Sequence, residues 1–123
     1  MLPAGIVATL ARNWPFANGA GRLVERLGAA ARAGQGPRQC RTSDGISLQV
    51  FADDLIGRHL IVSGQFEASL FRTLLDFAGP GDCMADIGAH VGYVSTMLLA
   101  RVPGSRVLAV EPQAEVGALL RHN

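Results

Sequence analysis

The fold class follows from one stretch of the sequence, Asp86-Ile-Gly-Ala-His-Val-Gly92, and from the segments on either side of it. The apolar run at 83–87 predicts a short strand before the turn, and apolar residues at helical spacing over 93–102 predict a helix after it. A second apolar run, 106–110, predicts another strand, and 114–121 begins a further helix. Strand, helix and strand of these lengths are typical of a βαβ unit, in which the two strands are parallel.

The region upstream predicts helices followed by a short β-hairpin. Residues 1–34 are rich in alanine and are expected to be helical, with breaks near Trp14-Pro15 and Asn18-Gly19. The glycines and the proline of Gly34–Pro37 are typical of a linker. The sequence therefore predicts an α/β protein in which N-terminal helices and a hairpin lead into the βαβ unit.

The two hairpin strands are expected on either side of a turn. Apolar and polar residues alternate over 46–51, which is the period of a half-buried strand. Turn-forming residues at 53–57 separate this strand from a second one at His59–Val62, which Gly64 would end. A helix with a broad apolar face is expected over Glu67–Ala78.

Composition excludes several classes of function. Of 123 residues, 49% are apolar and 17% charged, which is typical of a globular chain of about one domain. The formal net charge of +1 argues against a nucleic-acid partner and a polybasic membrane patch. The apolar start of the chain is interrupted by Arg12, so we expect neither a signal peptide nor a membrane span.

The cysteine and histidine residues give no sign of a disulfide framework or a metal site. Cys40 and Cys83 are far apart, and Cys83 falls in a strand that we expect to be buried. The three histidines are scattered, so no metal is expected. This cysteine usage indicates a reducing compartment, and we expect the protein to be cytoplasmic.

A ligand site is expected where the first strand of the βαβ unit ends. Open α/β sheets bind ligands in the crevice outside the carboxyl ends of their strands, and Asp86 stands there. A Cβ atom at Gly88 would hold a ligand off the backbone, and one at Gly92 would push the helix off the sheet. Glu111 ends the next strand twenty-three positions after Gly88, where a carboxylate can accept hydrogen bonds from the ribose hydroxyls of an adenosine ligand.

The glycine spacing favours one adenosine cofactor over another. Dinucleotide sites have the pattern G-x-G-x-x-G, whose central glycine lets the pyrophosphate reach the helix N-terminus. This chain has G-x-x-x-G, with the bulky His90 at that central position. The pattern therefore disfavours NAD and FAD. S-adenosylmethionine has no phosphate, and its cationic amino-acid end suits the carboxylate of Asp86.

At these positions the chain resembles the FkbM-type family of S-adenosylmethionine-dependent methyltransferases. The resemblance covers roughly residues 44–123, which would be a partial methyltransferase domain of Rossmann-like class I fold, and residues 1–43 would be an N-terminal helical segment with a linker. The motifs that carry it are Gly64-Gln-Phe-Glu67, Gly81-Asp82, Asp86-Ile-Gly-Ala-His-Val-Gly-Tyr93, Arg106-Val-Leu-Ala-Val-Glu-Pro112 and Leu119-Leu-Arg-His-Asn123.

The resemblance implies a set of cofactor-binding residues. They are Asp86, Gly88, Ala89, His90, Gly92, Glu111 and Gln113. Asp86 would orient the methionine amino group, the backbone of residues 88–90 would line the methionine and ribose, and Glu111 would bind the ribose diol. Gln113 would lie near the adenine edge. The family commonly has Asn at the position of His90, whose larger side chain could crowd the methionine end.

The resemblance also implies O-methylation of a hydroxyl group on a small-molecule acceptor, a sugar or a secondary metabolite. The sequence assigns no catalytic base and no oligomeric state. Because the sequence given stops within the helix after Glu111, we expect an N-terminal fragment that is inactive alone. Two alternatives stay open. One is a fragment of a nicotinamide-dependent oxidoreductase, and the other is a non-catalytic interaction protein with a Rossmann-like scaffold.

Overall fold

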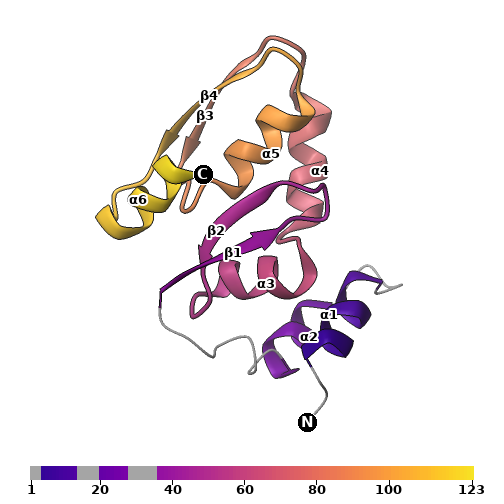
Figure 1. Cartoon of the computed structure of the whole chain (residues 1–123). Coiled ribbons are helices and arrows are strands. Elements are labelled where there is room, and N and C mark those ends of the chain that lie inside the picture. The colour runs from indigo at the N-terminus through magenta and orange to yellow at the C-terminus, as the bar shows by residue number, and fades with distance from the viewer. Residues whose placement is uncertain (1–3, 14–19, 28–35) are drawn as a thin grey trace. The chain divides into compact units, whose positions relative to one another are not determined.

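The computed structural model describes residues 4–13, 20–27 and 36–123, which form a mixed α/β structure of six helices and four strands (Figure 1). In chain order the elements are α1 (Ala4–Arg12), α2 (Ala20–Leu27), β1 (Pro37–Arg41), β2 (Ser47–Phe51), α3 (Leu55–Ser63), α4 (Ala68–Phe77), β3 (Cys83–Ile87), α5 (Tyr93–Arg101), β4 (Arg106–Val110) and α6 (Ala114–His122). The chain divides into two compact units, Met1–Phe66 and Glu67–Asn123. The domain boundary expected at 43/44 falls between β1 and β2 of the first unit. No helix among the described residues has the length and apolar character that crossing a membrane requires.

The first unit packs helices α1 and α2 on α3. Ala11, Val24 and Val62, one from each helix, are buried together. The guanidinium group of Arg12 donates a hydrogen bond from Nε to the backbone carbonyl of Val62 (3.4 Å). The helices predicted within residues 1–34 are therefore present at 4–12 and 20–27. The two predicted breaks and the first two residues of the predicted linker lie outside the described residues, and the linker's last residue, Pro37, begins β1.

The predicted hairpin is present, but only one of its two strands was predicted correctly. β1 pairs antiparallel with β2, with Cys40 opposite Leu48, so the strand at 46–51 pairs with a segment before it. The segment His59–Val62, expected to be the second strand, lies within α3. Capping decides this outcome. Asp54 accepts a hydrogen bond from the backbone N–H of Gly57 at the start of α3, and Gly64 ends the helix in the left-handed conformation (φ 74°).

Gly57 has a packing role inside α3 and is not a turn residue. A Cβ atom built on it would lie 1.8 Å from the backbone carbonyl oxygen of Phe51. Glycine therefore allows the first turn of α3 to approach the end of β2 more closely than any other residue could.

The second unit contains the predicted βαβ arrangement. β3 and β4 are parallel, with Asp86 opposite Ala109, and α5 lies between them in the chain. The helix predicted over Glu67–Ala78 is also confirmed, as α4. The buried hydrophobic residues of this unit come mainly from α5, α6 and the turn between β3 and α5; they are Phe71, Ala89, Val91, Tyr93, Met97, Leu98, Val102, Val116 and Leu119.

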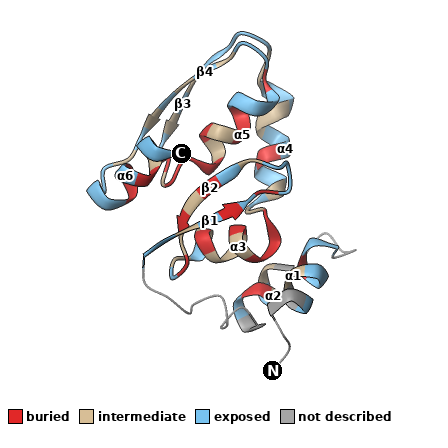
Figure 2. Ribbon diagram, in the orientation of Figure 1, coloured by how far each residue is buried: buried red, intermediate tan, exposed pale blue. Residues whose placement is uncertain are grey.

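The two faces of the β3–β4 pair differ in exposure, and neither strand contains a fully buried residue (Figure 2). The half-buried face carries Met84, Asp86, Val107 and Ala109, and the exposed face carries Cys83, Ala85, Ile87, Arg106, Leu108 and Val110. Ile87 is 74% exposed and Leu108 66%. The expectation that Cys83 is buried is therefore wrong, because the described helices cover one face of its strand and leave the other open.

Candidate functional site

The turn that connects β3 to α5 is fixed to the end of β4. The backbone N–H groups of Gly88 and Ala89 both donate to the carbonyl oxygen of Val110, at 2.8 and 3.0 Å. Within the turn, the N–H of Gly92 donates to the carbonyl of Ala89 (2.8 Å). The carboxyl ends of the two parallel strands are thus joined through the turn, which places the predicted site residues at one end of the sheet.

Three residues of this turn adopt left-handed backbone conformations: Gly88 (φ 82°), His90 (φ 52°) and Gly92 (φ 86°). A Cβ atom on Gly88 would meet nothing within 4 Å, so open space adjoins the backbone there. A Cβ atom on Gly92 would lie 2.8 Å from Cδ1 of Leu120. The close approach predicted at Gly92 therefore exists, but it is against a side chain of α6 and not against the sheet.

Glu111 holds the turn and the segment after β4 together. Its Oε2 accepts a hydrogen bond from the backbone N–H of His90 (3.0 Å), and its Oε1 accepts one from the backbone N–H of Gln113 (2.9 Å). The residue is half-buried. Its two hydrogen bonds to the backbone fix the direction of the carboxylate. A group oriented in this way can bind a ligand without first rearranging.

Asp86 makes a contact that the sequence did not predict. The hydroxyl of Ser95 donates a hydrogen bond of 2.6 Å to Oδ2 of Asp86. Ser95 lies in the first turn of α5 and is 5% exposed. In the sequence, the only indication of this contact is a serine in the helix that follows a strand-end carboxylate. Such a serine is too common to predict the contact without a structure.

The remaining predicted residues lie nearby with different degrees of exposure. Ala89 is buried and His90 half-buried, whereas Gln113 is exposed and precedes α6 as its N-cap residue, without a side-chain cap. A further residue that sequence reasoning missed is Asn123, whose Nδ2 donates to the carbonyl of Val91 (2.7 Å). The structure thus brings six of the seven predicted positions to the turn and the two strand ends, and the seventh, Gln113, is joined to Glu111 by its backbone N–H.

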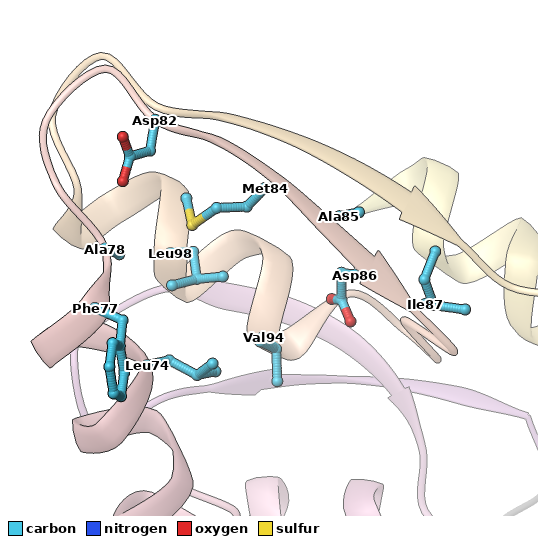
Figure 3. A pocket seen from close by; sticks show the side chains of 10 residues that line it. All are labelled: Leu74, Phe77, Ala78, Asp82, Met84, Ala85, Asp86, Ile87, Val94 and Leu98. Carbon is cyan, nitrogen blue, oxygen red and sulfur yellow. The ribbon is translucent and has the colours of Figure 1, made fainter.

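A groove of about 480 Å³ lies between β3, α4 and α5, along the edge of β3 that does not pair with β4 (Figure 3). Its lining is mainly apolar and includes Leu74, Phe77, Met84, Val94 and Leu98, with the carboxylates of Asp82 and Asp86. Of the seven predicted cofactor residues, Asp86 alone borders this groove. The groove follows the edge of β3 opposite β4, whereas the turn, Glu111 and Gln113 lie at the carboxyl end of the strand pair.

Within the described part of the chain, no group of three or more His, Cys, Asp or Glu residues could hold a metal ion. Comparison with known protein families, with curated proteins and with solved structures found no match to the chain.

Proposed function

We propose that this chain provides the cofactor-binding part of an S-adenosylmethionine-dependent methyltransferase with a Rossmann-like class I core, similar to the FkbM-type family. The observation that carries the proposal is the position of Glu111. Its carboxylate accepts a hydrogen bond from the backbone of His90, two residues after Gly88, where open space adjoins the backbone. A strand-end carboxylate next to a glycine turn is the arrangement that receives the ribose of an adenosine ligand in doubly wound sheets.

Glu111 retains the capacity to bind a diol. Each carboxylate oxygen has about two acceptor positions, and each oxygen of Glu111 uses one of them for a backbone N–H. Two adjacent ribose hydroxyls can donate to the remaining positions. Since the N–H groups that hold the carboxylate belong to the backbone, the carboxylate needs no other side chain to be oriented.

Asp86 would serve the other end of the cofactor. It is half-buried at the carboxyl end of β3, two residues before Gly88. A carboxylate there favours a cationic group, such as the ammonium of a methionine moiety, over a phosphate. The G-x-x-x-G spacing with His90 at its centre supports the same choice, because it removes the glycine that a pyrophosphate would need.

The cofactor would supply a methyl group on a cationic sulfur, and the protein would hold that group in line with an acceptor oxygen. We propose a small-molecule acceptor with a hydroxyl group, a sugar or a secondary metabolite, because the resemblance implies it. The cysteine usage supports a cytoplasmic location. Because no described residue is assigned as the base, cofactor binding is a sharper test than turnover.

The test is isothermal titration of the chain with S-adenosylmethionine, S-adenosylhomocysteine and NAD. We expect one binding site for the first two ligands and none for NAD. Glu111→Gln should weaken S-adenosylhomocysteine binding about tenfold or more, since it removes a charged acceptor. Glu115→Gln is the matched control, because it makes the same change at an exposed carboxylate in the first turn of α6; it should leave affinity unchanged.

Other outcomes would decide between the alternatives. Binding of NAD that depends on Glu111 would favour an oxidoreductase. Absence of binding to all three ligands, with a stable oligomer in light scattering, would favour a non-catalytic interaction protein. A thermal melt of each variant keeps loss of folding apart from loss of the ligand contact.

A further inference from the structure

We infer that Ser95 is a positioning residue for Asp86, and that this pair selects ligands with a cationic amino group. The inference rests on the proposed function, since it concerns how that site recognises the amino-acid end of its ligand. Ser95 belongs to α5 and lies outside the motif from Asp86 to Gly92, so a residue of the helix would contribute to recognition of the amino group.

The hydroxyl of Ser95 is directed away from its own helix. Serine and threonine in helices commonly donate to the carbonyl four residues earlier, and the neighbouring Thr96 does so, with its Oγ1 2.8 Å from the carbonyl oxygen of Gly92. The corresponding carbonyl for Ser95 is that of Val91, which accepts from Asn123 instead. The single hydroxyl hydrogen of Ser95 goes to Asp86 on the adjacent strand, at 2.6 Å.

This hydrogen bond orients the Asp86 carboxylate and uses only one of its two oxygens. It engages Oδ2, and among the described residues no group donates to Oδ1. Ser95 is 5% exposed, so water competes little for its hydroxyl, and the bond to a carboxylate is of the strong, charge-assisted kind. The carboxylate is therefore held in one rotamer with its second oxygen available to a ligand.

The available oxygen sets the class of ligand group. A carboxylate oxygen only accepts hydrogen bonds, so it binds a hydrogen-bond donor, and its negative charge favours a cationic one. A primary ammonium satisfies both conditions, whereas a ligand that lacks the amino-acid end gains nothing from Asp86. Loss of Ser95 should therefore reduce affinity selectively, according to what the ligand carries at that end.

The experiment compares two ligands that share an adenosine thioether. S-adenosylhomocysteine has the ammonium, and 5′-methylthioadenosine lacks the whole amino-acid end. Titration of the full chain should show that Ser95→Ala weakens S-adenosylhomocysteine about tenfold and changes 5′-methylthioadenosine less than twofold. Ser95→Thr, which keeps the hydroxyl, should restore most of the affinity for S-adenosylhomocysteine.

Thr96→Ala is the matched control, because it removes a hydroxyl one residue along α5 that does not contact Asp86. It should leave the affinity ratio of the two ligands unchanged. Equal weakening of both ligands by Ser95→Ala, or no weakening at all, would overturn the inference and leave the proposed function intact. If the unaltered chain binds neither ligand, the proposed function fails and this inference fails with it.

Discussion

The side-chain amide of Asn123 donates a hydrogen bond of 2.7 Å to the backbone carbonyl of Val91, thirty-two residues earlier in the chain. The bond ties the end of α6 to the glycine turn, on the same side as Leu120, which lies against Gly92. The cofactor-binding turn that we propose is therefore supported from two directions. Glu111 holds it from the end of β4, and α6 holds it from its own last turn.

Asn123→Ala should lower the free energy of unfolding by about 1 kcal/mol, since the carbonyl of the buried Val91 would lose its side-chain donor. Urea unfolding followed by circular dichroism measures this change. Asn13→Ala provides the comparison, because the side chain of Asn13 makes an exposed bond to the carbonyl of Thr9 within α1. That variant should change stability by less than about 0.5 kcal/mol. Equal effects of the two substitutions would show that the bond from α6 adds nothing beyond a surface contact.

Gly57→Ala and Gly117→Ala should have opposite effects, although both replace a glycine within a helix. At Gly57 the new Cβ would overlap the carbonyl oxygen of Phe51, so we expect a loss of about 3 kcal/mol or more, or failure to fold. At Gly117 the nearest atom would be 3.6 Å away, an ordinary contact, and alanine should stabilise α6 by about 0.5–1 kcal/mol. Thermal melts of the two variants test the pair. A tolerated Gly57→Ala would contradict the close approach of α3 to β2.

His90→Asn should preserve or slightly raise stability, whereas His90→Val should lower it by about 1–2 kcal/mol. The reason is the left-handed backbone at this position (φ 52°), which asparagine adopts readily and β-branched residues do not. Chemical denaturation gives the stability of each variant. Titration with S-adenosylhomocysteine then shows whether the smaller side chain eases access to the methionine end. A valine variant as stable as the unaltered chain would refute the conformational argument.

Acid should weaken the first unit through His59. Burial lowers the pKa of His59, with a further lowering by Arg58 that Glu25 opposes. The ring packs edge-on against Phe66, at 5.4 Å between centroids, and lies close to Gly21 of α2. Because the folded protein then binds the proton less readily than the unfolded chain, stability should fall as the pH drops below about 6.5, the ordinary pKa of histidine.

Urea midpoints at pH 7.5 and pH 5.5 measure this loss, and NMR titration of the ring measures the pKa directly. His59→Gln cannot be protonated and should remove this part of the pH dependence. His122→Gln is the control, because His122 is exposed on α6 in the other unit. If His59→Gln retains the full acid sensitivity, another group is responsible for it.

The second unit was predictable from sequence because local signals agree there. The strands β3 and β4 are apolar runs bounded by glycine, proline and acidic residues, and α5 begins directly after Gly92 and ends two residues before Pro103. Each boundary is set by residues within a few positions of it. The glycines of the turn could also be assigned, since their positive φ values at Gly88 and Gly92 are those that a tight strand-to-helix connection requires.

The first unit was harder because its pairing is not local. β1 buries Cys40 as its one fully buried residue and becomes a strand by pairing with β2, which its own sequence does not reveal. The segment His59–Val62 has β-branched residues, but the cap at Asp54 and the stop at Gly64 make it helical. The contact between Ser95 and Asp86 was out of reach for a similar reason, since it joins a helix to a strand through space.

The contrast between the two cysteines makes the protein directly usable in spectroscopy. Cys83 is exposed at the start of β3, while Cys40 is buried and its pKa is raised by that burial, so a thiol-reactive dye should attach selectively at Cys83 under native conditions. Cys83 stands four residues before the end of β3, roughly 13 Å along the strand from the turn that we propose to bind the cofactor. A fluorophore attached there would leave the turn unobstructed and would still be near enough to report its occupation, without any engineered cysteine.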